Sequence, residues 1–266
     1  MAPMRLERSH AEASSLCNLL YVVGGKVPSV QPLHSAECYN PLINTWTNIP
    51  AARVKRYNFG ISILGYMIYA CGGNDGEISH HRVECYDILT SKWITCPNMN
   101  SNLEGARATM SDNCLYCVGT TINQTIMERF DPREGQLCLM PPLLSYRKST
   151  DVVSHENSLF FSGGLNSNNL TQSNGERFDV RRSKWEHVSS MLSAKHGHSL
   201  VEMDGDIYGV GGGKTFTVEV VILVLFQNKN TRHASKYFNE IGPKDLASNI
   251  LNSRIREFPY LTLGSS

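Results

Sequence analysis

Apolar residues in this chain come in short runs of four or five, and nothing between the runs repeats with the period of a helix. The runs are rich in β-branched and aromatic residues and are bounded by Gly, Pro or Asn, which is typical of β-strands closed by turns. At the start of the chain this pattern predicts strands at about 10–16, 19–23, 35–40 and 45–49. The protein is therefore expected to be all-β.

One template of these runs recurs along the chain. It consists of a run with an aromatic residue, two glycines, a variable gap, Glu-x-aromatic, and a bulky residue seven positions after that aromatic. The first glycines stand at positions 24, 72, 119, 163 and 211, so the steps are 48, 47, 44 and 48 residues. The residues that recur in the three best copies, to which we assign a structural role, are Gly24, Gly25, Tyr39, Trp46, Gly72, Gly73, Tyr86, Trp93, Gly163, Gly164, Phe178 and Trp185.

The spacing inside the template separates paired strands from loops. The interval from the aromatic to the bulky residue is 7 in four copies, whereas the gap from the first glycine to the Glu is 13, 12, 9 and 13. A fixed interval is what two paired strands require, because a slip of one residue turns every side chain to the other face. A variable gap is typical of a surface loop. Each repeat is thus expected to hold four short strands.

Four-stranded units that repeat every 44–48 residues are typical of the blades of a β-propeller. The glycine pair, the Tyr and the Trp at these offsets resemble the kelch motif, over about residues 8–213. The resemblance implies a kelch-type β-propeller of four-stranded antiparallel blades, four complete and a fifth partial, which is incomplete relative to a six-bladed ring. The implied division is 1–7 as an N-terminal extension, blades at about 8–55, 56–102, 103–146 and 147–194, the start of a fifth at 195–213, and 214–266 as a divergent C-terminal segment.

The repeated residue types have physical reasons. Glycines are expected where the backbone turns sharply and a neighbouring blade comes close. The Trp and the Tyr or Phe are expected to fill the space between adjacent blades. In the third copy Thr120 replaces the second glycine and Leu137 replaces the Trp, which predicts that the third blade is the weakest-packed one.

A basic residue stands 13 positions before the aromatic of the first run in four of the five copies, and the third copy has Leu103 at that offset. Equivalent positions in a propeller lie around one channel mouth, so these residues and their polar neighbours are candidates for a partner-binding ring: Arg8, His10, Arg56, Asn58, Arg107, Arg147, Lys148, Lys195 and His196. Such a ring suits an acidic peptide, and it predicts that charge reversal of Arg56 and Arg147 leaves the melting temperature nearly unchanged. The alternative, which stays open, is that the basic residues pair with the repeating Glu at 37, 84, 128 and 176 and hold the strands together.

The charge balance of the chain limits the classes of partner to be expected. The 25 Lys and Arg face 24 Asp and Glu, so the net charge of +1 gives no electrostatic reason to expect nucleic acid or an anionic membrane. The longest apolar run near the C-terminus, 220–226, is too short to cross a bilayer, and the first twenty residues show no signal peptide. We therefore expect a cytoplasmic protein whose eight cysteines are reduced thiols.

Features that could carry chemistry have simpler interpretations. The histidines at 80, 81, 196 and 198 lie in expected loops or strand starts without the carboxylate spacing of a metal site. The glycines at 211–213 followed by a Lys lack the leading glycine spacing and the following helix of a phosphate loop. Cys114 and Cys117 lie in an expected strand, where residues three apart point to opposite faces. We expect no catalytic site, no metal and no cofactor.

The repeats look most like the propeller of BTB-kelch (kelch-like) proteins, which recruit substrates to cullin-type ubiquitin ligases. This resemblance implies a protein-interaction module that reaches ubiquitin-ligase components through a full-length form, since the BTB and BACK segments that engage the cullin have no counterpart here. The alternative, also from resemblance, is a kelch protein that binds actin or the cytoskeleton. A kelch-like copper oxidase is a third class, but its ligand set is not specifically matched.

The repeat signature ends after Gly213, whereas six blades of about 47 residues need roughly 282. A propeller that cannot close has two open flanks and an unpaired strand edge, which favours association with other copies. We therefore expect a poorly stable or oligomeric chain. Size-exclusion chromatography with light scattering tests this, and a monomer that unfolds in one sharp transition would show that residues 214–266 close the ring.

Overall fold

The computed structural model describes residues 1–27, 31–203, 205–212 and 218–221, so most of the segment after Gly213 lies outside the described residues. The described part forms nineteen strands in five antiparallel sheets and contains no helix. Blade 1 comprises β1 (Glu12–Leu16), β2 (Leu19–Val23), β3 (Ala36–Asn40) and β4 (Thr45–Ile49). Blade 2 comprises β5 (Gly60–Leu64), β6 (Met67–Cys71), β7 (Val83–Asp87) and β8 (Lys92–Thr95).

The next three sheets continue the same order along the chain. Blade 3 comprises β9 (Glu104–Ser111), β10 (Cys114–Thr120), β11 (Thr125–Asp131) and β12 (Gln136–Leu139). Blade 4 comprises β13 (Asp151–His155), β14 (Ser158–Ser162), β15 (Gly175–Asp179) and β16 (Lys184–Val188). Blade 5 has three described strands, β17 (His198–Met203), β18 (Asp206–Gly211) and β19 (Val218–Val221). Four blades and a smaller fifth are therefore present, as the repeats predict.

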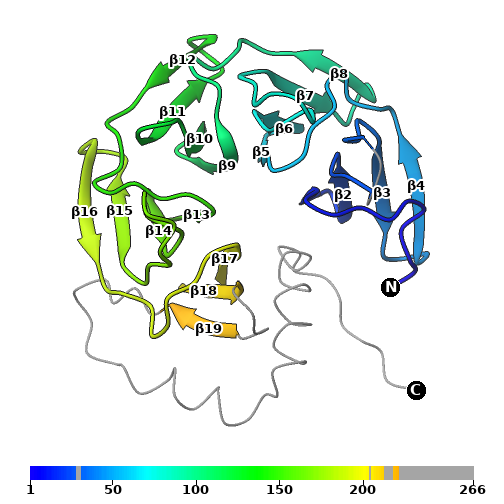
Figure 1. Ribbon diagram of the computed structural model, residues 1–266. Helices are drawn as coiled ribbons and strands as arrows, with labels where there is room; N and C mark the ends of the chain where they lie inside the picture. The colour runs from blue at the N-terminus through cyan, green and yellow to red at the C-terminus, as the bar shows by residue number, and fades with distance from the viewer. Residues whose placement is uncertain (28–30, 204, 213–217, 222–266) are drawn as a thin grey trace.

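The five blades follow one another around an arc with the first strand of each blade innermost (Figure 1). The inner strands β1, β5, β9, β13 and β17 contact one another in that order. The described residues do not form a closed ring. The arrangement is that of a β-propeller, whose interior positions are filled by side chains between neighbouring sheets.

Tight turns join the two inner strands of each blade. In blade 1 the turn residues Cys17 and Asn18 both have positive φ, at 52° and 63°, and in blade 3 Asp112 and Asn113 have 49° and 57°. Two consecutive residues of positive φ define the type I′ turn, whose twist matches that of the flanking strands. Asn and Asp tolerate this conformation better than other non-glycine residues, which explains their place between the apolar runs.

The interval of seven residues sets the strand register that the sequence predicts. It places Tyr39 opposite Trp46, Tyr86 opposite Trp93, and Phe178 opposite Trp185. Each Trp also donates its indole Nε1–H to a backbone carbonyl of the segment that precedes its blade: Ala2, Pro50 and Pro141, at 2.9, 2.7 and 2.9 Å. The expected packing role of the aromatic residues is confirmed, and each Trp additionally fixes the linker that enters its blade.

The first seven residues, which the sequence analysis assigned to an N-terminal extension, contact blade 1. The Ala2 carbonyl accepts the Trp46 bond, and the backbone N–H groups of Arg5 and Leu6 donate to the Glu37 carboxylate at 2.8 and 3.2 Å. Residues 50–54 make the same contacts with blade 2. A sequence that lacks the repeat's marker residues gives no sign of these backbone contacts.

The first glycine of the pair allows the next linker to approach. Gly24 has a φ of +61°, and a Cβ there would lie 2.5 Å from the carbonyl oxygen of Arg56 in the following linker. Gly163 has the same relation to the carbonyl oxygen of Lys195, also at 2.5 Å. Both the positive φ and the lack of space for a Cβ exclude a side chain at these positions. The glycines therefore fix how closely adjacent blades pack.

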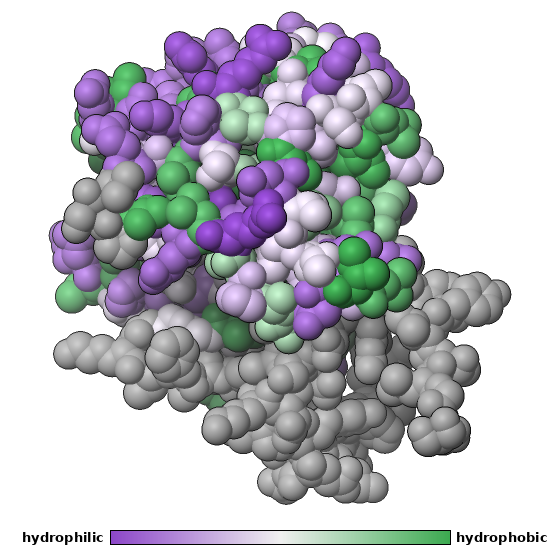
Figure 2. Space-filling view, turned by 90° about the vertical axis from the view of Figure 1, so that its right-hand side faces the viewer, coloured by the Kyte–Doolittle hydropathy of each residue, from purple (hydrophilic) through white to green (hydrophobic). Residues whose placement is uncertain are grey.

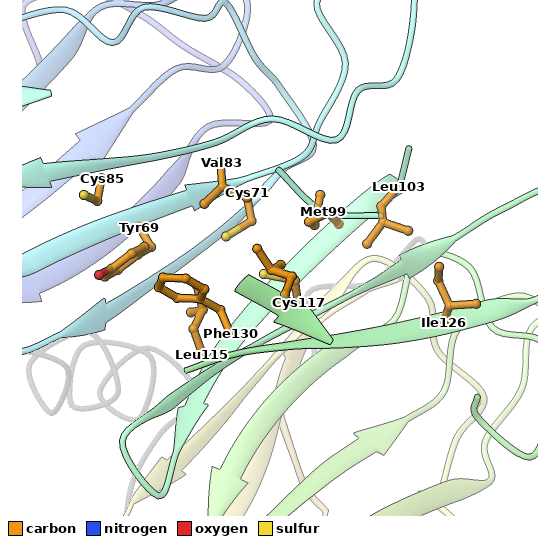
Figure 3. Close-up of a cluster of buried hydrophobic side chains, with 12 residues drawn as sticks. Tyr69, Cys71, Val83, Cys85, Met99, Leu103, Leu115, Cys117, Ile126 and Phe130 are labelled. Carbon is orange, nitrogen blue, oxygen red and sulfur yellow. The ribbon is translucent and has the colours of Figure 1, made fainter. Parts of the chain in front are cut away.

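The third blade, predicted to be the weakest-packed one, has a buried apolar core, and its rank among the blades stays a prediction. Without the second glycine its inner strands continue, and β9 and β10 reach eight and seven residues. Leu103, Leu115 and Cys117 are fully buried in the cluster between blades 2 and 3. Figure 3 shows Leu103 beside Met99, Cys117 beside Cys71, and Leu115 beside Phe130. Leu137 is itself buried there at the Trp position.

The outermost strands β4 and β8 each bury a single residue, the Trp, and most of their other residues are exposed. Figure 2 shows this outer side with hydrophilic residues mixed among apolar ones.

All eight cysteines are free thiols. Within the described residues, no helix is long and apolar enough to cross a bilayer.

Candidate functional site

Three of the basic residues predicted to ring the channel mouth are buried inside their blades. The Nη2 atoms of Arg8, Arg56 and Arg147 lie 2.8, 2.9 and 2.9 Å from a carboxylate oxygen of Glu37, Glu84 and Glu176. No more than 2 % of any of these six side chains is exposed. The pairing of the repeating arginine with the repeating glutamate is therefore confirmed in blades 1, 2 and 4.

Each buried guanidinium also holds the ends of two strands together. In blade 4 the Nη1 atom of Arg147 donates to the carbonyl oxygens of Gly163 and Asn174, at 2.8 and 2.9 Å. In blade 1 Arg8 makes the same two bonds, to Gly24 and Ser35, at 2.8 and 2.9 Å. The arginine thus satisfies the carbonyls at the end of the second strand and before the third, where the ladder is interrupted by the loop.

The repeating glutamate in turn accepts backbone N–H groups of the linker that enters its blade. Glu84 accepts those of Arg53 and Val54, at 2.9 and 3.1 Å. Burial lowers the pKa of the Arg56 guanidinium, and the adjacent Glu84 carboxylate opposes that shift. A buried charge needs both a counter-charge and hydrogen-bond partners, and this network supplies both.

Arg8, Arg56 and Arg147 are therefore corrected from surface candidates to structural residues. Their charged groups are enclosed, so a partner cannot reach them without opening the blade. The expectation that charge reversal of Arg56 and Arg147 leaves stability unchanged does not hold for such a pair. Lys195, at the same position of the fifth repeat, is also buried.

In the third repeat the buried glutamate has other hydrogen-bond partners than an arginine. Leu103 takes the arginine position, and the buried Glu128 accepts the backbone N–H and the side-chain amide of Asn100, both at 2.8 Å, and the N–H of Ser101 at 3.1 Å. Arg107 lies four residues further on, in β9. Its guanidinium reaches Glu12 of blade 1 at 3.5 Å and Asp151 of blade 4 at 3.7 Å. It therefore links three blades at their inner strands.

The remaining candidates lie on one side of the molecule, which we call the linker face. It carries the linkers between blades and the loops between the second and third strands, which isolated bridges such as Ser9 with Lys26 join. His10 and Asn58 occupy equivalent turns there with φ of 55° and 49°, and the Asn58 N–H donates to the His10 carbonyl at 3.2 Å.

Blade 4 places its candidates on the same face. Lys148 is half-buried and forms a backbone bridge with Leu165. His196 is also half-buried, and its Nδ1 lies 3.3 Å from the Thr171 hydroxyl. These two residues and the pair at the junction of blades 1 and 2 lie at different blades of one face. Because Arg8, Arg56, Arg147 and Lys195 are buried, the nine candidates do not form one exposed ring.

The structure also brings in two residues that the sequence analysis missed. The Lys26 ammonium lies 4.9 Å from the centre of the Tyr57 ring, and the His10 ring meets the same Tyr57 edge-on at 6.3 Å. Lys26 directly follows a glycine pair, and Tyr57 directly follows the buried Arg56. That adjacency to repeat markers is the signal that could have found them.

The loops of the linker face differ between blades. Those of blades 1, 2 and 4 fold back through bridges, of which Lys26 with Pro32 and Asn74 with Ser79 are examples, whereas blade 3 has a tight turn closed by Thr121 and Gln124. Ile78, Ile122 and Leu170 are exposed in these loops, by 61, 95 and 62 %. A rigid set of strands therefore carries variable loops with exposed apolar residues.

Lowering the pH should destabilise the protein through His80, which is buried in the loop of blade 2. Burial, followed by the Arg56 charge, lowers the His80 pKa to about 4. Between that value and the unfolded pKa of about 6.5, the unfolded chain binds the proton more strongly. Stability is therefore complete above pH 6.5 and falls as the pH approaches 4, by roughly 2 kcal/mol between pH 7 and 5.

Denaturant unfolding at pH 7 and 5 measures this loss. His80→Leu should reduce the difference, and His81→Gln, at the half-buried neighbouring position, should keep it. His198 contributes in the same direction because burial lowers its pKa too, although Asp151 opposes the shift. If the loss of stability between pH 7 and pH 5 is the same in His80→Leu as in the wild type, His80 does not cause it.

Comparison with known proteins agrees with this geometry. The Kelch motif family matches residues 7–51, 55–100 and 146–192, which together are more than half of the chain. The chain belongs to the Kelch motif family. The matched segments contain blades 1, 2 and 4, in which the arginine–glutamate pair is complete, and leave out blade 3.

Kelch-like proteins are among the relatives of this kelch chain. Kelch-like protein 40 of Xenopus laevis is 25 % identical over 232 residues, which are 83 % of this chain and 38 % of that protein. Kelch-like protein 23 of Homo sapiens is 27 % identical over 203 residues, 73 % of this chain and 35 % of that protein. The chain therefore spans less than two-fifths of the length of these relatives. The solved structure of YjhT superimposes with a TM-score of 0.68 at 13 % identity, over 80 % of this chain and 75 % of YjhT, and supports the fold alone.

A kelch propeller is generally a binding scaffold. Within the part of the chain that the structure describes, no group of three His, Cys, Asp or Glu side chains is placed to hold a metal ion. What the site offers is recognition: exposed loops, half-buried basic residues and aromatic rings on one face.

Proposed function

We propose that this kelch chain is a protein-interaction module that recognises substrates for a cullin-type ubiquitin ligase, in the cytoplasm, through its linker face. The observation that carries the proposal is that the structural residues and the variable loops of a repeat are separate. Buried arginine–glutamate pairs hold the linkers and strand ends, while the loops beside them vary in length and composition. Recognition surfaces are commonly built from variable loops on a rigid scaffold.

The partner is an acidic protein segment. The exposed or half-buried basic residues on the linker face include His10, Lys26, Lys148 and His196, and the buried arginines do not contribute. The apolar residues exposed in the loops add contact area beside these charges. The ligase role is supported by the match to Kelch-like proteins over the repeats.

Turnover of bound partners tests the ligase role. The 266-residue chain carries the repeats, so in excess it should occupy a substrate of the full-length adaptor and slow its degradation. The measurement is the half-life of each protein that binds the chain, with and without excess chain, and with and without a proteasome inhibitor. The half-lives should be longer in the presence of excess chain, and the inhibitor should abolish this difference. If captured partners keep their half-lives, the ligase role is wrong.

Actin co-sedimentation tests the cytoskeletal alternative. The chain should remain in the supernatant when actin filaments are pelleted. Saturable co-sedimentation would instead assign the linker face to actin and overturn the proposal.

A further inference from the structure

The junction of blades 1 and 2 on the linker face holds a compact cationic cluster. Tyr57 lies at its centre, with the Lys26 ammonium over the ring and the His10 ring against its edge. The backbone bond from Asn58 to His10 ties the two blades together at this point. Three elements therefore position the cluster: the two linker turns and the loop that follows β2.

The charges of the cluster are unequally balanced. Arg107 lies near His10, but Glu12 and Asp151 already compensate its charge. Neither Lys26 nor His10 forms an ion pair with any residue that the structure describes. Lys26 is half-buried and His10 exposed, so both remain within reach of solvent. The uncompensated charge at the junction is that of Lys26.

The geometry points to a carboxylate-binding subsite formed by Lys26, His10 and Tyr57, which takes an Asp or Glu side chain of an acidic peptide. This inference rests on the proposed function, because it assigns one contact of the linker face. The Lys26 ammonium supplies the charge-assisted hydrogen bond. The His10 ring supplies a second donor, and the Tyr57 ring keeps Lys26 in place from below.

The titration of His10 reports on occupancy. Burial and the charges of Lys26 and Arg107 lower its pKa, while Glu12 lies on the following strand of the same blade. A carboxylate bound beside His10 stabilises the imidazolium, so its pKa should rise. By linkage, the peptide should bind more tightly as the pH falls through the pKa of His10.

The probe is an acetylated and amidated hexaglutamate peptide, titrated into the 266-residue protein while NMR follows the His10 ring protons. The His10 pKa should rise on binding, and added salt should reverse the effect. Lys26→Ala should weaken binding about three- to tenfold. Lys92→Ala is the matched control, since it removes one exposed charge from the outermost strand of blade 2, outside the linker face, and it should change the affinity less than twofold. Tryptophan fluorescence shows that both variants stay folded.

The outcomes separate this subsite from the proposed function. If hexaglutamate leaves His10 unchanged, or if the two variants weaken binding equally, the subsite is wrong even where partners are still captured and stabilised in cells. A peptide with a single phosphoserine and no Asp or Glu is run in parallel. If it shifts His10 and hexaglutamate does not, the subsite binds phosphate and the carboxylate assignment is overturned. A His10 shift by hexaglutamate together with unchanged partner half-lives would keep the subsite and reject the ligase role.

Discussion

Arg147→Leu is expected to lower the free energy of unfolding by about 3–5 kcal/mol, since it removes one partner of a fully buried ion pair. The change leaves the Glu176 carboxylate without its counter-charge and frees the carbonyls of Gly163 and Asn174. Both effects are costly in a low-dielectric interior. The measurement is thermal or denaturant unfolding, and the melting temperature should drop by roughly 10 °C.

The chain offers both a control and a rescue for this variant. Lys148→Ala alters the next residue, which is only half-buried, and should change stability by no more than about 0.5 kcal/mol. Blade 3 folds with Leu103 at the arginine position because Asn100 donates to the buried Glu128. Its counterpart in blade 4 is Leu144, so the double variant Leu144→Asn with Arg147→Leu should recover part of the loss. An Arg147→Leu protein as stable as wild type would show that the pair is dispensable.

Trp93→Ala is expected to cost about 3–5 kcal/mol, because it opens a cavity between blades 1 and 2. Trp93 is buried against Tyr86, with ring centres 5.3 Å apart, and packs in a cluster that includes Tyr21 of blade 1. Its indole also donates to the Pro50 carbonyl at 2.7 Å. The loss should appear as a lower unfolding midpoint, and partner binding should fail only where the protein unfolds.

Trp93→Phe separates the two contributions. It keeps an aromatic ring in the cavity but removes the bond to Pro50, so about 1–2 kcal/mol should be lost. Lys92→Ala, at the exposed neighbouring position, should have almost no effect. If Trp93→Ala lost binding at a temperature where its fluorescence and circular dichroism showed a native fold, the Trp would have a role in recognition that this structure does not give it.

The structural residues were predictable because their evidence lies within one repeat. Paired strands need a constant interval, and the seven residues from Tyr86 to Trp93 give the register that the structure has. Asn, Asp and Gly occupy many of the turn positions with positive φ, so the places of these turns were visible as well. The binding candidates were less predictable, since the same arginine pattern allowed either a surface ring or internal ion pairs.

The sequence by itself thus determined the repeat, the strands, the register and the aromatic core, all of which follow from local periodicity. Only the tertiary structure decided which charges are buried. Arg56 can be buried because Glu84, 28 residues later in the chain, lies beside it and also accepts backbone N–H groups of the linker. Lys26 and Tyr57 meet only because two blades pack side by side. Burial of a charge depends on whether distant groups can replace its water, and that is a property of the packed blades and not of any segment alone.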